Sequence, residues 1–402
     1  MKTALRHPVW HPYTQHALAG EPIEIDRAAG AHLITKDGRR IFDAISSWWV
    51  NLHGHAHPKI AAAIAAQAKR LEQVIFAGFT HEPAERLAEK LLALVPEGLG
   101  HVFFSDDGST AVEAAVKMAL GARPGRTKIA ALEHAYHGDT FGAMSVSARG
   151  PFTDPYKRQL FDVVRLPLED PGGALCDDLA AVIVEPLVLG AGGMKMYSAE
   201  TLRALSQACK RKGILLIADE VMTGFGRTGT LFACEQAGIS PDIMCLSKGI
   251  TGGFLPMGVT VASPEVFDAF YAQDRSKTFF HGHSYTANPL ACAAALANLE
   301  IFETEPVFER IKSIERAHSQ GLARLRGNPE IAETRQLGTI SAVELRADDA
   351  GYLSRSGPKL SDFFLSKGVL LRPLGNVVYL MPPYCSTDED IALAYDAIHD
   401  AL

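Results

Sequence analysis

Two short apolar segments, residues 214–220 and 242–249, most constrain the fold of this 402-residue chain. Each contains a run of about five apolar residues, the pattern of a strand buried on both faces of a parallel sheet. The first run is followed by Asp219 and Glu220, and the second leads to Lys248. Ligands of open α/β sheets sit beyond the carboxyl ends of parallel strands. Two neighbouring strands could therefore place a carboxylate and an amine in one crevice.

Strands and helices alternate from residue 58 to residue 300, which predicts an α/β fold with a mostly parallel sheet and helices on both faces. The expected strands cover residues 102–105, 129–132, 163–166, 181–185, 214–218, 243–247 and 259–262. The expected helices cover residues 58–71, 83–94, 110–120, 199–212 and 289–300. We predict that residues 51–298 form a large domain with its own core.

The chain beyond residue 298 follows a different pattern. A long amphipathic helix is expected over 305–325, strands over 338–345, 369–373 and 377–381, and a terminal helix over 388–402. The N-terminal arm, residues 1–50, is rich in loops, with a hairpin expected around residues 36–39. We expect this arm to fold back beside residues 299–402, so that both ends of the chain form a smaller α+β domain.

Composition excludes several classes of function. The net charge is −7, and no Lys/Arg run of the kind that binds polyphosphate backbones is present, which argues against a nucleic-acid binder. The six cysteines are scattered without a C-x-x-C motif, so neither a disulfide framework nor a zinc site is expected. The first residues lack the apolar run of a signal peptide, and no stretch reaches membrane-spanning length. These features predict a cytoplasmic protein that does not bind a membrane.

A phosphate-binding helix start is expected around Gly108 and Ser109. The strand 102–105 ends just before Gly108, which admits close approach of a ligand, and hydroxyl side chains follow. Backbone N–H groups and the helix dipole favour a phosphate at such a start. Thr110 and Glu113 also fit a capping box, so an ordinary capped helix is the alternative.

Polar groups also follow the other strands. Tyr136 lies after the strand 129–132, and Glu185 closes the strand 181–184. An aromatic ring at this rim could stack on a flat cofactor, although a packed loop aromatic is common. Pyridoxal phosphate requires a lysine to hold its aldehyde as a Schiff base and a carboxylate to keep its pyridine nitrogen protonated. Lys248 and Asp219 fit these roles, and a lysine that merely reaches solvent is the alternative.

Residues 224–229 match the dinucleotide-binding pattern G-x-G-x-x-G letter for letter. In a genuine fingerprint the first glycine ends the strand and the third lies in the following helix. Here residues 219–223 separate the expected strand from Gly224, and residues 230–235 make a poor long helix. We therefore interpret the motif as a glycine-rich active-site loop.

Two other patterns could suggest different chemistry. Histidines cluster at residues 53, 55 and 57 and again at 281 and 283, but no acid or cysteine stands at ligand spacing. Hydrogen-bonding loops are therefore preferred to a metal site. Asp106 and Asp107 could suggest the paired carboxylates of a glycoside hydrolase, but neighbouring side chains on a turn usually diverge. No metal is predicted.

The combined segments resemble the class III aminotransferases, which are pyridoxal-phosphate enzymes of fold type I. The resemblance covers nearly the whole chain and is strongest over residues 216–229 and 241–248. It implies that Lys248 forms the Schiff base and that Asp219 pairs with the pyridine nitrogen. It also implies a homodimer with shared active sites.

A narrower resemblance rests on residues 11–14, 46–49, 134–142, 371–373 and 379–384. These segments are similar to the members of the family that move an amino group from S-adenosylmethionine to 8-amino-7-oxononanoate in biotin biosynthesis, giving 7,8-diaminononanoate. The resemblance implies a catalytic set of Lys248, Asp219 and Tyr136. It implies cofactor contacts from Gly108, Ser109, Tyr136, Asp219, Lys248, His283 and Ser284, and substrate contacts from Tyr13, Trp48, Tyr136, Lys248, Gly282 and Arg372. Gly282, His283 and Ser284 would reach the phosphate across the dimer interface.

The chain departs from that pattern at two places. Many members carry Gly-Pro-Thr where this chain has residues 282–284, and many carry glutamine where Leu189 stands. Both changes bear more on the amino donor than on the cofactor. Three alternatives remain: another class III enzyme acting on ornithine, 4-aminobutyrate or an ω-amino acid, a glutamate-semialdehyde-type aminomutase, and a nicotinamide oxidoreductase built on residues 224–229.

Overall fold

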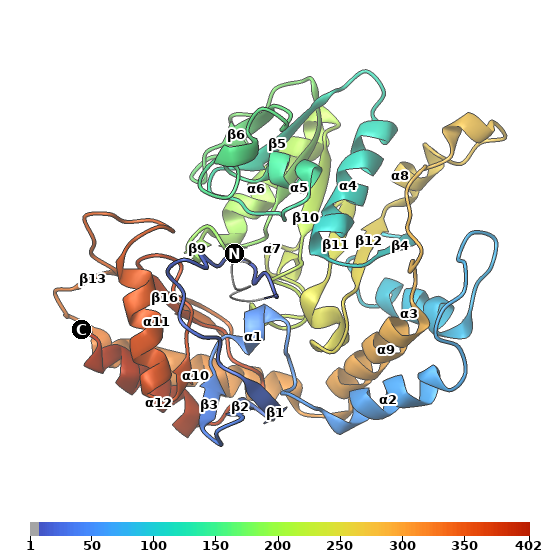
Figure 1. The fold of residues 1–402 in the computed structure, drawn as a ribbon. Helices are drawn as coiled ribbons and strands as arrows, with labels where there is room; N and C mark the ends of the chain where they lie inside the picture. The colour runs from blue at the N-terminus through green and yellow to red at the C-terminus, as the bar shows by residue number, and fades with distance from the viewer. Residues whose placement is uncertain (1–7) are drawn as a thin grey trace, which may run out of the picture.

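A seven-stranded sheet forms the centre of the protein, as the computed structural model of residues 8–402 shows (Figure 1). The strand order is β4 (His101–Ser105), β12 (Gly258–Ala262), β11 (Ile243–Leu246), β10 (Leu215–Asp219), β7 (Leu179–Val184), β5 (Lys128–Leu132) and β6 (Val163–Leu166). Only β12 is antiparallel to its neighbours, and the other six strands of this sheet run in one direction. The predicted α/β fold with a mostly parallel sheet is confirmed. Residues 1–7, where the sequence predicts no signal peptide, lie outside the described part.

The strands are apolar on both sides because helices cover both faces of the sheet. In β10, Leu215 and Ile217 pack into the core that contains α4 (Gly108–Ala122). Leu216 and Ala218 pack into the opposite core with α6 (Ala199–Lys212). Side chains alternate along a strand, so Asp219 follows Leu215 and Ile217 onto the side of α4. The sequence pattern thus determines on which face the carboxylate emerges.

Helix α4 begins two residues earlier than expected. Asp107 is its N-cap, because its Oδ1 accepts from the N–H of Thr110 at 2.8 Å while the Thr110 hydroxyl accepts from the N–H of Asp107 at 3.1 Å. The capping box predicted for Thr110 and Glu113 is therefore wrong. Glu113 instead accepts from the backbone N–H of Gly142 at 2.7 Å, which ties α4 to α5 (Phe141–Val146).

Two smaller sheets lie outside the central one, the first built from both ends of the chain and the second from C-terminal strands alone. The first contains β1 (Ile25–Ala29), β2 (His32–Thr35), β3 (Arg40–Asp43) and β15 (Val369–Leu370). The second contains β13 (Ile331–Leu337), β14 (Ile340–Leu345) and β16 (Val377–Leu380). The parallel pairing of β3 with β15 places the N-terminal arm beside the C-terminal part. The domain limits near residues 50 and 298 stay predictions.

The C-terminal strands differ in part from the expected ones. The single strand expected over 338–345 is half of an antiparallel hairpin, in which Gly338 has a φ of 55° and lies in the turn between β13 and β14. The helices of this part are α10 (Val307–Leu325), α11 (Ser356–Ser366) and α12 (Asp388–Asp400), and they lie together in Figure 1. The sequence did not predict α11.

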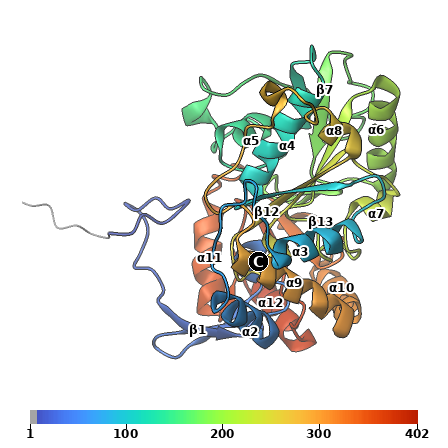
Figure 2. The ribbon, with the colours of Figure 1, turned by 90° about the vertical axis from the view of Figure 1, so that its right-hand side faces the viewer.

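The remaining helices include a group that packs beside the large sheet. It contains α2 (Pro58–Ala68), α3 (Glu82–Leu92) and α9 (Pro289–Thr304), which lie side by side in Figures 1 and 2. Figure 2 also shows the first described residues extending away from the rest of the chain. The short elements are α1 (Ser46–Trp49), α7 (Cys234–Ala237), α8 (Pro264–Asp268), β8 (Val188–Leu189), β9 (Lys195–Met196), η1 (Asp154–Tyr156), η2 (Lys248–Thr251) and η3 (Arg275–Lys277). Over residues 8–402, no helix combines the length and apolar character needed to cross a bilayer.

Candidate active site

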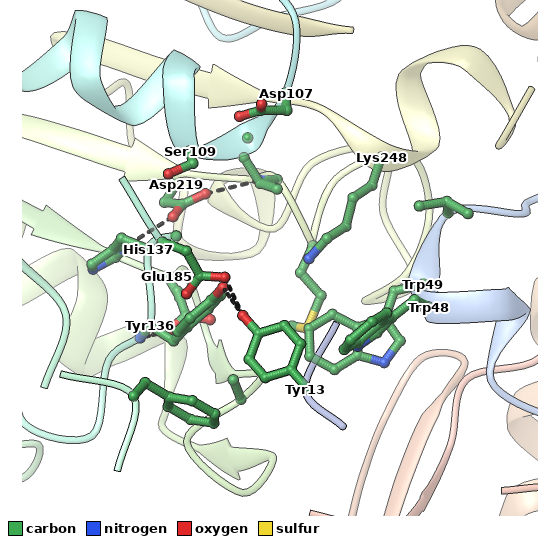
Figure 3. Close-up of a pocket in the computed structure, with 18 of the residues that line it drawn as sticks. Tyr13, Trp48, Trp49, Asp107, Ser109, Tyr136, His137, Glu185, Asp219 and Lys248 are labelled. Carbon is green, nitrogen blue, oxygen red and sulfur yellow. Dashed lines mark hydrogen bonds and ion pairs between the residues drawn. The ribbon is translucent and has the colours of Figure 1, made fainter. Parts of the chain in front are cut away.

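The carboxyl ends of five strands meet at one cavity of about 570 Å³ (Figure 3). The residues that follow these strands and line the cavity are Gly108 after β4, Tyr136 after β5, Glu185 after β7, Asp219 at the end of β10 and Lys248 after β11. All five strands run in the same direction, so their ends lie on one edge of the sheet. The prediction that these groups share a crevice is confirmed.

Lys248 is the first residue of η2, directly beyond β11. Its backbone has a φ of 48°, and its Nζ lies 4.4 Å from the centroid of the Trp49 ring. Figure 3 shows the side chain reaching into the cavity from the side opposite His137 and Glu185. Burial lowers the pKa of Lys248 to about 8, although the charges of Asp219 and Glu185 favour its protonated form. About a tenth of this amine is therefore unprotonated and nucleophilic at pH 7, far more than of an ordinary lysine.

Asp219 is buried and forms a close pair with His137. Its Oδ2 lies 2.6 Å from His137 Nδ1, and its Oδ1 accepts from the backbone N–H of Val221 at 3.1 Å. His137 is also buried, and its Nε2 has no hydrogen-bond partner within the described chain. Since Nδ1 faces a carboxylate, the proton belongs on Nδ1. From the sequence, the neighbouring Tyr136 was expected at this strand end, and the contact of His137 was not predicted.

The start of α4 can accept a phosphate. A Cβ at residue 108 would lie 2.6 Å from Val221 Cγ1, so only glycine fits there. Ser109 follows, with its Oγ 2.8 Å from Thr140 Oγ1. The helix behind these residues is 15 residues long, and its dipole favours an anion at its N-terminus. Together with the amine of Lys248, the carboxylate of Asp219 and the ring of Tyr136, this start provides each group that pyridoxal phosphate needs.

Aromatic side chains and one arginine form the other end of the cavity. The Tyr13 hydroxyl lies 3.1 Å from that of Tyr136 and donates to Asp139. The Tyr13 ring meets the edge of Trp48 at 5.3 Å, and the Arg372 guanidinium lies 4.9 Å from the Trp48 ring centroid. Within residues 8–402, no carboxylate pairs with Arg372. A planar guanidinium without a carboxylate partner suits a substrate carboxylate.

Glu185 is a further buried acid at this edge. Its two carboxylate oxygens accept from the backbone N–H groups of Tyr136 and Gly190, each at 2.9 Å. Burial raises the pKa of Glu185 to about 7, and the nearby charge of Asp219 acts in the same direction. Glu185 therefore connects the loop that carries Tyr136 to the residues after β7. The sequence predicted that Glu185 lies at this edge of the sheet but did not indicate what it does there.

Other predicted site residues lie elsewhere. Gly282, His283 and Ser284 line a second cavity of about 730 Å³ beside β4, together with Ile75 and Phe76. The single chain therefore does not bring them to Lys248. None of the residues 224–229 lines the first cavity, so the prediction that they form an active-site loop is wrong.

Residues 224–229 instead support the site from outside the cavity. The buried Arg227 donates to the backbone oxygen atoms of Trp49 at 3.3 Å and Asn51 at 3.1 Å. The cavity residues that sequence reasoning missed include His137, Asp139, Phe152, Tyr352 and Tyr379. His137, Asp139 and Tyr379 stand inside segments that carried the family resemblance, which was the available signal.

Residues 14–402 match the family model described as aminotransferase class-III. A relative from Synechococcus elongatus, named adenosylmethionine-8-amino-7-oxononanoate aminotransferase, is 49% identical and covers 98% of this chain and 99% of its own length. A crystal structure of an enzyme with that name from Methanocaldococcus jannaschii has a TM-score of 0.93 at 36% identity, covering 98% of this chain and 97% of that chain. An amine transaminase from an uncultivated Pseudomonas species, in its PLP-bound form, has a TM-score of 0.89 at 32% identity, covering 100% and 98%. The similarity thus extends over nearly the whole of each chain.

Proposed function

This chain belongs to the class III aminotransferases, and from that premise we infer that it moves an amino group from S-adenosylmethionine to 8-amino-7-oxononanoate in biotin biosynthesis. The product would be 7,8-diaminononanoate. The observation that carries this conclusion is the single cavity in which Lys248 and Asp219 meet the substrate-side set of Tyr13, Trp48 and Arg372. The cofactor is pyridoxal phosphate, whose requirements match the groups of this cavity.

When bound, pyridoxal phosphate supplies an aldehyde that bonds amines and a ring that accepts an electron pair from the substrate. Gly108 and Ser109 would hold its phosphate, and Tyr136 would stack on its ring. Asp219 would keep the ring nitrogen protonated, and His137 would hold the Asp219 carboxylate in place. These assignments use charge and hydrogen bonds that are arranged before the substrate arrives, so no reorganisation is needed during the reaction.

Lys248 would have two roles. Its amine holds the cofactor between turnovers, because its low pKa leaves the nucleophilic form available. When a substrate amine has taken its place, Nζ would be free to accept the proton from the substrate carbon as a base and to donate it again as an acid. A base works best when its pKa lies near the working pH, and a value of about 8 meets this condition.

The substrate-side residues would fix two different molecules in turn. Arg372 would bind a carboxylate of each with its planar fork. Trp48 would provide a flat apolar wall for the aliphatic chain of the keto acid, and its electron-rich face would attract the sulfonium of the donor. Tyr13 and Asp139, which are hydrogen-bonded to each other, lie where they can bind the polar groups of either substrate.

A homodimer would complete the site. Ile75, Phe79, Phe280 and Tyr285 are more than half exposed, at 63%, 62%, 74% and 61%. They belong to two segments that touch, because Gln73 donates to the backbone oxygen of Ser284 at 2.9 Å. An exposed apolar group of this kind marks an interface. A second copy seated there would bring Gly282, His283 and Ser284 to the phosphate of the facing subunit.

The cytoplasm is the proposed compartment. All six cysteines are free thiols in the structure, which is typical of proteins of a reducing compartment.

Product analysis tests the proposed reaction. The purified enzyme with pyridoxal phosphate and 8-amino-7-oxononanoate would be given S-adenosylmethionine, lysine, ornithine or 4-aminobutyrate as the donor, with Lys248→Ala as the inactive control. We expect 7,8-diaminononanoate with S-adenosylmethionine. Transfer from another donor alone would change the proposed substrate, and isomerisation without transfer would indicate an aminomutase. Oxidation that requires a nicotinamide would contradict the proposal altogether.

A further inference from the structure

The segment that carries the two indole rings has an unusual backbone. Ser46, Ser47 and Trp49 have positive φ angles of 51°, 58° and 70°. Residues other than glycine rarely adopt this region, because their Cβ crowds the neighbouring carbonyl group. Strained residues of this kind persist only where the surrounding structure holds them. Contacts from outside must therefore hold α1.

The buried carboxylate of Asp43 provides one set of these contacts. Asp43 Oδ1 accepts from the backbone N–H of Ser47 at 2.8 Å, and its Oδ2 accepts from the Ser47 hydroxyl at 2.8 Å. His55 Nε2 lies 2.8 Å from the same Oδ2. The side chain of Asp43 is fully buried, and in the described chain His55 is its only ion-pair contact. A carboxylate without solvent needs such donors, and Ser47 provides two of the three.

His55 connects this carboxylate to the rest of the fold. The amide nitrogen of Asn51 lies 3.2 Å from His55 Nδ1, so Nδ1 accepts and Nε2 carries the proton that faces Asp43. The backbone N–H of His55 donates to the oxygen of Gly30 at 2.7 Å. One histidine of the 53–57 cluster thus has a role that the cofactor chemistry does not require. The residues 8–402 contain no group of three metal-binding side chains.

Three other contacts hold the segment from its opposite side. The Ser46 hydroxyl donates to the backbone oxygen of Met381 at 2.7 Å. Trp49 Nε1 donates to the Tyr379 hydroxyl at 3.0 Å, and Arg227 donates to the backbone oxygen of Trp49. The strained segment is therefore fixed at both ends by buried groups. This arrangement leaves α1 little freedom to move.

Both indole rings of α1 lie against cations of the cavity. The Trp49 ring is 4.4 Å from Lys248 Nζ, and the Trp48 ring is 4.9 Å from the Arg372 guanidinium. Aromatic faces attract cations at these distances. We propose that Asp43, together with Ser47 and His55, is a positioning residue that holds α1 in its strained conformation and so sets Trp48 against Arg372 and Trp49 against Lys248. Asp43 lines no part of the cavity itself. The kinetic part of this proposal rests on the proposed function, and the spectroscopic part does not.

The first test replaces Asp43. The variant Asp43→Asn keeps the side-chain shape but removes the charge and one acceptor for Ser47. In a Trp10→Phe background, the indole bands at the long-wavelength edge of the near-ultraviolet circular dichroism report Trp48 and Trp49, since the chain has three tryptophans and its tyrosines and phenylalanines absorb at shorter wavelengths. We expect this signal to weaken and KM for both substrates to rise about ten- to a hundredfold, with a smaller change in kcat. Asp37→Asn, which removes an exposed carboxylate of the β2–β3 turn, is the matched control and should change neither.

The second test separates positioning from stability. Glycine accepts positive φ, so Ser47→Gly should relieve strain, which offsets part of the cost of losing the hydroxyl donor to Asp43, while it loosens α1. Ser47→Ala loses the same hydroxyl but keeps the strained Cβ, so it should be less stable than Ser47→Gly. We expect Ser47→Gly to raise KM and weaken the indole signal while it remains more stable than Ser47→Ala. Unchanged KM and unchanged indole signal in both Ser47→Gly and Asp43→Asn would overturn the proposal.

The readouts also distinguish this proposal from the proposed reaction. A weaker indole signal in the two variants would support the positioning role even if another substrate pair were found for the enzyme. An unchanged indole signal, with the native enzyme converting 8-amino-7-oxononanoate, would reject the positioning role and leave the reaction intact.

Discussion

His137 Nδ1 lies 2.6 Å from Asp219 Oδ2, and both side chains are buried at the end of the central sheet. The two residues are 82 positions apart in the sequence. The imidazole N–H gives the carboxylate a donor on one oxygen, while the N–H of Val221 serves the other. Both carboxylate oxygens of Asp219 are thereby oriented, and an oriented carboxylate is what a protonated pyridine nitrogen requires.

Removing the charge of Asp219 should reduce turnover strongly. Asp219→Asn keeps the shape but cannot hold the ring nitrogen protonated, and we expect a loss of about 10²–10³ in kcat, as for other preorganised electrostatic groups. Steady-state kinetics at confirmed cofactor occupancy would measure it. Asp177→Asn, at a side chain that is 89% exposed, controls for the change in net charge. Turnover close to that of the native enzyme would contradict the role of Asp219.

The pKa of Lys248 should determine how the rate of cofactor capture depends on pH. Burial lowers this pKa to about 8, so the reactive free amine accumulates as the pH rises through 8 rather than through the ordinary value of 10.5. We expect the rate at which the apoenzyme captures pyridoxal phosphate in a borohydride-reducible form to increase with pH and to reach half its maximum near pH 8. Lys248→Ala should bind the cofactor through its phosphate and ring, form no reducible bond, and lose essentially all turnover. A midpoint near 10.5, or reducible capture in the alanine variant, would refute the assignment.

Glu185 should make the apoenzyme less stable as the pH rises from 4.5 to 7. The folded chain holds a proton on Glu185 up to about pH 7, whereas an ordinary glutamate loses it near pH 4.5. Because the folded state binds more protons in this window, its stability falls with rising pH, by at most about 3 kcal/mol from this group. Denaturant unfolding at several pH values should show that the free energy of unfolding falls less with rising pH in Glu185→Gln than in the native protein. In the surface variant Glu97→Gln, the free energy of unfolding should change with pH as it does in the native protein. The same change in all three proteins would contradict the raised pKa of Glu185.

Shared active sites predict complementation between two inactive variants. Lys248→Ala lacks the catalytic amine, and Ser284→Asp would place a like charge against the phosphate of the facing subunit. In a mixed dimer, one site would carry both changes and the other neither, so a one-to-one mixture should recover about one quarter of native activity. Remixing after reversible dissociation, with each variant alone as control, measures this recovery. No recovery despite confirmed mixed dimers would mean that Ser284 acts within its own chain or not at all.

The parts of the fold that the sequence predicted are those with a strong local pattern. β10 and β11 are continuous apolar runs that end on charged residues, so both strands and the ends that carry Asp219 and Lys248 were predictable. By contrast, β13 is largely exposed and polar, and its residues show no clear alternation. Helix α11 has Gly357 and Pro358 in its first turn, which is a signal for a loop unless the proline lies at a helix start.

The parts of the site that could not be predicted are contacts between distant segments. Nothing in the sequence near Trp48 indicates that its ring meets Arg372, because that contact depends on how the two ends of the chain pack. The predicted start of α4 was wrong for a different reason. Two overlapping capping patterns share Thr110, and only the three-dimensional contacts of Glu113 with α5 show which one forms.

The contact between Arg372 and Trp48 allows the two half-reactions to be separated. Arg372 has no carboxylate partner in the described chain and lies 4.9 Å from the Trp48 ring. A charge-assisted pair in a site without water contributes roughly 1.5–3 kcal/mol, so Arg372→Ala should slow both half-reactions by about tenfold or more. Arg372→Lys should restore only part of the loss, because an ammonium cannot replace the planar fork.

Trp48→Ala should impair the donor half-reaction more than the keto-acid half-reaction, since in the donor half the ring faces a sulfonium. Single-turnover absorbance changes, recorded separately with donor and with keto acid, give both rates. Equal losses in the two halves for Trp48→Ala, or no loss for Arg372→Ala, would show that the substrates bind elsewhere in the cavity.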